Sequence, residues 1–258
     1  MTSAGGPAGE VRVWAVRQEP PWRESLSLSL LDAGERAKAA SFTRGGDRSM
    51  YLAAHAGLRL LLGDRLGLHP RDLRFGRDRC AHCGGQHGRP VLLDGPDDLH
   101  FSLSHCAGLT LVGVADAPVG VDAERLPDRR TVELCLTRLH PRERDELLGT
   151  PWAQRPLRFC RLWTRKEAYL KALGTGLGRG LDRDYLGDGR VGRPAGWTVA
   201  NLSCGPRDGV HAAALAVPAG VRWPVGLREL NWSSYGHVPL RVASLEEKGH
   251  VDIPTVCD

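Results

Sequence analysis

Apolar and polar positions alternate along several parts of the chain in the way that strands require. Residues 11–16 (VRVWAV) follow a period of two, and residues 101–115 predict two more strands joined by a turn at 107–108. A short strand is expected after the break at Pro118, and the later segments WTVANL and HAAALAV return to strand patterns. The chain is therefore predicted to contain several short strands.

Helical periodicity occupies three other regions. From Asp32 to Leu68 an apolar stripe follows an aspartate that is placed to cap a helix, and it ends near Gly67. Residues 131–148 predict one helix, and residues 156–173 predict a stronger one that Gly174 closes. The order of strands and helices indicates an α+β protein of two similar halves, which we place at residues 1–117 and 118–258.

Composition narrows the class of protein and its compartment. The chain of 258 residues has 41% apolar residues, a net charge of +5 and seven cysteines. No apolar run approaches the roughly 20 residues of a membrane span, and the N-terminus lacks the basic start and apolar stretch of a secretory signal. We therefore expect a cytoplasmic protein with reduced thiols and no membrane partner. Its positive charge suits an anionic partner, which could be a nucleic acid, an acidic protein or a phosphorylated cofactor.

The segment VGVDAE carries two carboxylates that a strand would place side by side. Asp122 and Glu124 are two residues apart, so they share one face of the strand predicted there. In isolation such a pair is more often solvent-facing than functional. When the two side chains are brought together, they repel each other unless a cation lies between them, and oxygen ligands suit Mg²⁺.

The segment FCRLWTRKEAYLKALGTGLGRGL makes unusual use of lysine. The chain has 35 basic side chains, yet lysine occurs only at positions 38, 166, 171 and 248. Glu167 and Lys171 are four residues apart on one helix face and could form an ordinary surface ion pair. That interpretation does not explain lysine, because arginine would serve equally well. A compact ammonium on a flexible stem suits contact with a phosphate beside a metal.

Two upstream stretches add candidates for anion binding. In FSLSH, alternation places His105 on one face of the predicted strand, with Ser104 on the other. A lone histidine at a strand end is more often structural than functional. Arg89 of the segment GRP lies in a predicted loop, where it is free to meet an anion.

These stretches together resemble a known family. GRP, FSLSH, VGVDAE and WTRKEAYLKALGTGL, in this order and spacing, resemble the Sfp-type 4′-phosphopantetheinyl transferases, and the tryptophan before KEA resembles the W/KEA subgroup. A looser likeness in ERAKAASF extends the resemblance over most of residues 30–180. The abundance of Arg, Gly and Ala is similar to that of actinobacterial proteins. The resemblance implies two pseudo-symmetric α+β halves with the active site in the cleft between them.

The resemblance also implies roles for individual residues. Asp122, Glu124 and Glu167 are expected to hold Mg²⁺ (or Mn²⁺), and Glu167 is expected to act as the base, directly or through a water. The catalytic set is then Glu167, Asp122 and Lys166. Coenzyme A is expected to contact a larger set of residues: Lys38, Arg44, Arg48, Arg89, Ser104, His105, Lys166 and Lys171. Arginine replaces the family's commoner lysine in GRP, and Ala123 fills the middle of D-x-E, but neither change removes a ligand.

The implied reaction attaches phosphopantetheine to a carrier protein. A serine hydroxyl of an apo acyl or peptidyl carrier protein would attack the β-phosphorus of coenzyme A, with release of 3′,5′-ADP, for fatty acid, polyketide or nonribosomal peptide synthesis. Carrier proteins are acidic around that serine, which suits a basic enzyme. We expect a monomer that binds no nucleic acid. Which carrier proteins it serves stays open.

Two other functions compete with this one. CAHCGGQH offers Cys80, Cys83 and His87 (or His82) as half of a zinc site, and a zinc-containing nucleic-acid-binding module would fit the basic pI of 9.0. Structural zinc takes four ligands, and no second pair follows at a suitable spacing, so we expect no zinc. The 6% of aromatic residues and the lack of a basic run with interleaved aromatics also disfavour this module. A non-catalytic regulator that binds coenzyme A would keep the lysines but would not need three carboxylates.

Overall fold

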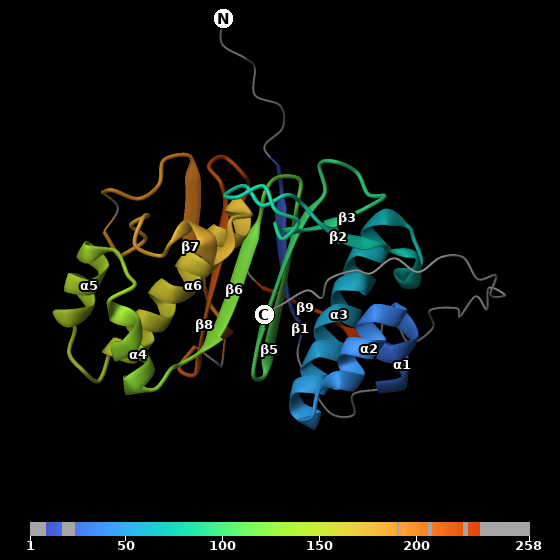
Figure 1. The fold of residues 1–258 in the computed structure, drawn as a ribbon, viewed down its shortest axis with the longest axis horizontal. Coiled ribbons are helices and arrows are strands. Elements are labelled where there is room, and N and C mark those ends of the chain that lie inside the picture. Colours follow the sequence, from blue (N-terminus) through green and yellow to red (C-terminus); the bar gives the residue numbers. More distant parts are fainter. Residues whose placement is uncertain (1–8, 17–23, 190, 206–207, 224–226, 233–258) are drawn as a thin grey trace, which may run out of the picture.

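The computed structural model describes residues 9–16, 24–189, 191–205, 208–223 and 227–232, and the statements below concern those ranges. Helices flank two sheets, which confirms the predicted α+β class (Figure 1). None of the helices in these ranges has both the length and the apolar character to cross a membrane. The cysteines within the described ranges are free thiols.

Two sheets form the centre of the molecule, and a small hairpin lies beside them. The first sheet has the order β4-β5-β1-β9, in which β9 is parallel to β1 and the other pairs are antiparallel. The second is antiparallel, with the order β6-β8-β7. The strands are β1 (Val11–Val16), β4 (His100–Cys106), β5 (Leu109–Ala115), β6 (Gly120–Arg125), β7 (Trp197–Leu202), β8 (His211–Pro218) and β9 (Arg228–Glu229), and the hairpin is β2 (Phe75–Arg77) with β3 (Pro90–Leu92).

Helices cover the outer face of each sheet (Figure 1). The long helix α3 packs on the first sheet, and α6 packs on the second together with α4 and α5. Between the sheets lies a core of small and branched side chains from β1, β5, β6 and β8. The helices are α1 (Glu24–Leu30), α2 (Ala33–Ser41), α3 (Gly45–Leu66), α4 (Arg129–Leu136), α5 (Pro141–Leu148) and α6 (Arg155–Leu173), with short 3-10 turns at Pro70–Asp72 and Gly176–Arg179.

Local sequence signals place most of these elements as predicted. Asp32 caps α2 by accepting a hydrogen bond from the Glu35 amide at 2.8 Å. Gly67 and Gly174 end α3 and α6 in the left-handed conformation that glycine favours. The turn between β4 and β5 falls at 107–108, as expected.

The prediction of a single helix over residues 131–148 is wrong. The segment is divided between α4, which ends at Leu136, and α5, which begins at Pro141. Proline disfavours helical backbone in the residue before it, and His140 instead caps α5 from a non-helical backbone conformation. Pro141 is therefore a local sequence signal for the start of a second helix.

The two halves of the chain are interlocked by β9. We expected residues 118–258 to form the C-terminal half, yet Arg228–Glu229 pairs with β1 in the sheet of the N-terminal half. Leu230 donates a backbone hydrogen bond to Ala15 at 3.1 Å and packs into the core beneath α3. The strands before residue 117 therefore belong to the first sheet or the hairpin, and those after it belong to the second sheet, with the exception of β9.

The backbone of β6 lies directly against α6 at Gly120. A Cβ atom at this position would lie 1.9 Å from the carbonyl oxygen of Ala168 and 2.6 Å from the amide nitrogen of Ala172. Only glycine permits such an approach of strand to helix. This contact fixes the distance between the two elements that carry the predicted carboxylates.

We predict that Gly120→Ala forces β6 and α6 apart and lowers Tm by roughly 6–12 °C, which corresponds to about 3 kcal/mol of overpacking. Thermal unfolding followed by circular dichroism measures the change. The control is Gly46→Ala in the first turn of α3, where an added Cβ meets nothing within 4 Å and alanine suits a helix. A Gly120→Ala protein with the parent Tm would contradict the close contact.

Candidate active site

Asp122 and Glu124 lie on the face of β6 that looks toward α6. Val121 and Ala123 point into the core between the sheets, so the alternate positions point the other way. Gly120, on that same face, touches α6. The strand therefore presents both carboxylates toward the helix that carries Glu167, as the i, i+2 spacing predicted.

Asp122 is the most buried of the three carboxylates and has two close partners. Only 3% of the residue is exposed, and its Oδ1 accepts hydrogen bonds from Ser104 Oγ at 2.9 Å and from Lys171 Nζ at 2.8 Å. Ser104 Oγ in turn accepts a hydrogen bond from the Ala123 amide at 3.3 Å, which ties β4 to β6. Lys171 thus forms a 2.8 Å ion pair with the strand, which helix spacing alone did not predict.

Glu124 and Glu167 share the negative field of Asp122. The pKa of Glu167 is raised to about 7. Burial is the main cause, the charge of Asp122 adds to it, and Lys171 opposes it. Burial likewise raises the pKa of Glu124 to about 7, with Asp122 and Glu167 adding to the effect and Lys171 again opposing it. Two of the three carboxylates therefore exchange protons near neutral pH, and the three interact electrostatically.

Two histidines connect this cluster to the helices of the first sheet. Burial lowers the pKa of His105, and the nearby His55 and Lys171 lower it further. His55 Nδ1 lies 3.0 Å from Glu35 Oε1, and its ring stacks on Tyr51. A line of titratable groups therefore runs from α2 through α3 and β4 to Lys171 on α6.

The carboxylates have the chemistry of a hard-cation site. Asp122 Oδ2 is buried and has no hydrogen-bond partner among the described residues, so it is an acceptor in need of a positive group. Oxygen-only donors suit Mg²⁺ or Mn²⁺. The oxygens of Asp122, Glu124 and Glu167 do not all lie within 4.8 Å of one another. Among the described residues, the ligand atoms of Cys80, Cys83 and His87 meet that distance.

The comparisons with known proteins identify a family. A family model described as the 4′-phosphopantetheinyl transferase superfamily matches residues 118–197, which contain β6 and α6. The 4′-phosphopantetheinyl transferase HetI of a Nostoc species is 33% identical over 175 residues, or 66% of this chain and 71% of the relative. The chain belongs to the 4′-phosphopantetheinyl transferase superfamily. The transferase Sfp of Bacillus subtilis is 25% identical over 155 residues, 60% of this chain and 65% of Sfp. Another B. subtilis 4′-phosphopantetheinyl transferase is 25% identical over 175 residues, 67% of this chain and 74% of the relative.

Membership of the transferase superfamily confirms the resemblance to Sfp-type enzymes. The structure gives two of the residues assigned to coenzyme A, Lys166 and Ser104, contacts inside the protein. Lys166 was expected to contact coenzyme A, but its side chain is 3% exposed and forms a 2.8 Å ion pair with the fully buried Glu143. Its ammonium also donates to the carbonyl oxygens of Leu181 and Asp184, both at 2.7 Å. All three donors are used inside the protein, so Lys166 anchors α6 and does not reach a phosphate.

Ser104 also has a different role from the expected one. It was assigned to coenzyme A, but its buried hydroxyl hydrogen is donated to Asp122. Alternation correctly placed it on the face opposite His105. The sequence could not show that this face meets β6, because that contact joins two separate sheets.

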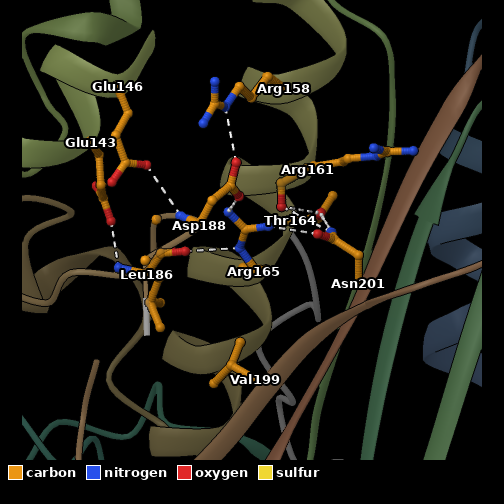
Figure 2. Close-up of polar contacts among 12 residues, drawn as sticks. Glu143, Glu146, Arg158, Arg161, Thr164, Arg165, Leu186, Asp188, Val199 and Asn201 are labelled. Carbon is orange, nitrogen blue, oxygen red and sulfur yellow. Dashed lines mark hydrogen bonds and ion pairs between the residues drawn. The ribbon is translucent and has the colours of Figure 1, made fainter. Parts of the chain in front are cut away.

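A polar network holds the back of α6 in this transferase (Figure 2). Arg165 donates to the Leu186 carbonyl at 2.8 Å, to Asn201 at 2.7 Å and to Asp188 at 2.9 Å. Arg158 pairs with the other oxygen of Asp188 at 2.9 Å. These contacts fix the rotation of α6 and so direct Glu167 and Lys171 toward β6.

The remaining predicted coenzyme A ligands surround the line of titratable groups. Arg89 lies next to the end of α6, where its guanidinium donates to the Ala172 carbonyl at 3.4 Å. Lys38 lies on α2 one turn beyond Glu35, and Arg48 precedes His55 by seven residues on one face of α3. Arg44 occupies the N-cap position of α3, where its side chain makes no capping hydrogen bond. Their contacts with coenzyme A stay predictions.

Sequence reasoning missed the polar groups buried within α3 and α5. His55 and Arg59 interrupt the apolar run YLAAHAGLRLLLG four residues apart, which is a usable signal for a shared polar contact, and both bind Glu35. Glu143 gives no such signal. It follows a proline in the polar segment HPRERDE, which favours an exposed helix start.

We predict a pH-dependent stability that originates at Glu167. Its ordinary pKa of 4.5 rises to about 7 in the folded protein, so the folded state retains a proton that the unfolded chain releases between those values. Stability conferred by that proton is complete below about pH 4.5 and is lost as the pH rises toward 7. In EDTA, Glu167→Gln should therefore gain stability relative to the parent as the pH rises.

The measurement is Tm of both proteins in EDTA across this pH range, with Glu133→Gln on the exposed surface of α4 as a matched control. The difference between parent and control should stay constant with pH. A Glu167→Gln protein whose Tm tracked the parent at every pH would remove Glu167 from the carboxylate cluster.

Proposed function

We propose that this chain transfers 4′-phosphopantetheine from coenzyme A to a serine hydroxyl of an apo acyl or peptidyl carrier protein, with release of 3′,5′-ADP. Family membership supports the reaction class. The observation that carries the assignment to this chain is the arrangement of Glu167, with a pKa of about 7, beside the Asp122–Lys171 ion pair. A basic group near neutrality next to a phosphate-binding cation is what a phosphoryl transfer to an alcohol requires.

Glu167 is suited to take the proton of the attacking serine. A carboxylate with an ordinary pKa is a weak base toward a hydroxyl, whereas a value of about 7 is matched to the pH of the cell. The proton reaches Glu167 directly or through a water. Lys171 and the network behind α6 keep this carboxylate turned toward β6.

The cations around the cluster bind the phosphates of coenzyme A in this proposal. The Lys171 side chain is 33% exposed, so its ammonium can contact a diphosphate while it stays near Asp122. Arg89 and His105 flank it from the loop before β3 and from β4. Lys38, Arg44 and Arg48 complete the nucleotide grip from the N-terminal helices.

Asp122, Glu124 and Glu167 would hold a divalent cation, which we propose is Mg²⁺. When bound, such an ion neutralises charge on the phosphoryl oxygens and orients the diphosphate. The unpartnered Asp122 Oδ2 and the two carboxyls with pKa values of about 7 fit this donor set. Binding of the ion would favour their deprotonated forms.

The site is built by both halves of the chain, which supports an active site between them. Ser104 and His105 come from β4, whereas the carboxylates and Lys171 come from β6 and α6. We propose residues 1–117 as the half that grips the nucleotide and residues 118–258 as the catalytic half. We further propose a cytoplasmic monomer of the W/KEA subgroup, whose positive charge favours encounter with acidic carrier proteins.

The direct test is incubation with apo carrier protein, coenzyme A and Mg²⁺, followed by mass spectrometry of the carrier. The phosphopantetheine mass increment should appear, and it should disappear when EDTA replaces Mg²⁺. A regulator that only binds coenzyme A would give no increment, and neither would a nucleic-acid-binding module.

Glu167→Gln separates binding from catalysis. The change keeps size and hydrogen-bonding shape but removes charge and basicity, so coenzyme A should still bind in calorimetry. The transfer rate should fall by a factor of roughly 10²–10⁴, the usual value of a general base, or by more if the cation is also lost. Transfer at the parent rate would contradict the catalytic role of Glu167.

The two neighbouring lysines should differ in their effect on coenzyme A binding. Lys171→Arg keeps the positive charge beside the buried Asp122, so it should keep the parent Tm within a few degrees but, with a larger and planar head group, weaken coenzyme A binding and slow transfer. Lys166→Met leaves Glu143 buried without its ion-pair partner, which costs about 3–5 kcal/mol and lowers Tm by roughly 10 °C. If Lys166→Met were stable and failed only in coenzyme A binding, the correction of its role would be wrong.

A further inference from the structure

The loop between β2 and β3 gathers two thiols and an imidazole at one point. Cys80 Sγ, Cys83 Sγ and a ring nitrogen of His87 all lie within 4.8 Å of one another, and Cys83 Sγ is 2.9 Å from His87 Nε2. Cys80 is buried, whereas the other two are exposed. The carboxylate cluster contains none of these residues, and the proposed transfer reaction gives them no role.

The backbone of this loop forms a tight turn that brings the two cysteines together. Gly84 follows Cys83 with a φ of 74°, and its amide donates to the Cys80 carbonyl at 2.8 Å. The Cys80 amide donates to the Gly85 carbonyl at 2.7 Å. This folding of C-x-x-C-G turns the two sulfur atoms toward one side, and only a residue tolerant of positive φ suits position 84.

Backbone hydrogen bonds, such as that from the Gly88 amide to the Asp78 carbonyl at 2.9 Å, hold this loop, but few of its side chains are buried. Three glycines (84, 85 and 88) make it costly to fix, and Cys80 and Gly88 are the buried residues between positions 78 and 88. Gly88 is constrained by a close approach, since a Cβ there would lie 2.6 Å from the Asp78 carbonyl oxygen. A ligand shared by three side chains would add contacts that hold the loop in place.

We propose that Cys80, Cys83 and His87 bind one zinc ion, with a fourth position open to solvent. Two sulfurs and one imidazole nitrogen are a donor set that zinc favours, and three protein ligands plus water is a known arrangement for it. The expectation of no zinc rested on the missing second pair of ligands. The folded loop brings the three donors that the sequence offered within 4.8 Å of one another, and a water can complete the tetrahedron.

The geometry requires only a small adjustment. Zinc bonds of about 2.3 Å to sulfur and 2.0 Å to nitrogen at tetrahedral angles separate the two ligand atoms by roughly 3.6 Å. Cys83 Sγ and His87 Nε2 are 2.9 Å apart, so they would move by a fraction of an ångström. Both are exposed and free to do so.

A bound ion would fix the loop against the end of α6. Cys80 Sγ lies 4.0 Å from the Thr175 carbonyl just beyond α6, and Arg89 leaves the loop to contact Ala172 within that helix. His82, in contrast, lies beside Gly178, where a Cβ on the glycine would meet its ring at 3.3 Å. The ligand set therefore excludes His82 and offers an internal control.

The test measures metal directly and does not depend on transfer activity. The full chain is loaded with zinc, freed of excess metal by gel filtration and analysed by mass spectrometry of the elements. We expect about one zinc per chain, and Co²⁺ loading should give a thiolate-to-cobalt absorption band. Competition with a chromophoric chelator then gives the affinity of the parent and the variants.

Cys83→Ser and His87→Ala are the main variants, because both side chains are exposed and their loss leaves the core intact. Each should weaken zinc binding by more than about 100-fold, since even partners outside the ligand set change affinity 10–100-fold. His82→Ala should bind as the parent does. Zinc at background level in the loaded parent would overturn the proposal, as would equal zinc content in the parent and Cys83→Ser. Loss of zinc from His82→Ala would overturn the ligand set.

Discussion

The backbone contact between β6 and α6 at Gly120 sets the geometry of everything that follows. A strand and a helix normally stay separated by two layers of side chains, but here a missing Cβ and the small residues Ala168 and Ala172 let them meet. Because the strand alternates, the same face carries Asp122 and Glu124 two and four residues later. Glu167 directly precedes Ala168, and Lys171 directly precedes Ala172. The close contact at Gly120 thus also brings the charged side chains of β6 and α6 toward each other.

The helices and strands could largely be read from the sequence because their signals are local. Periodicity, the Asp32 cap and the glycine at 174 act within a few residues, and the structure has α2, α3 and α6 where these signals place them. The division of α4 from α5 also has a local signal, because Pro141 begins α5. By contrast, β9 is two residues long, and only its pairing with β1 defines it. No local pattern distinguishes such a strand from a loop.

The candidate site could be predicted as a set of residue types but not as a set of directions. Three consecutive residues of α6 show why. Arg165 turns to Asp188 and Asn201, Lys166 turns to Glu143, and Glu167 turns to β6. Successive helix positions are about 100° apart, so only one of three neighbours can face a given partner. The sequence showed two lysines near one glutamate, whereas burial decided that Lys171 meets the carboxylates and Lys166 holds the helix in place.

The return of β9 to the first sheet has a consequence for the order in which the chain is made. On the ribosome the segment that contains β1 to β5 emerges first, with β1 exposing one hydrogen-bonding edge and with Leu230 absent from the core beneath α3. That edge can be covered only after about a hundred further residues have been synthesised and the second sheet has been laid down between them. During synthesis the edge of β1 therefore stays unpaired with β9 until the last described segment of the polypeptide has been made.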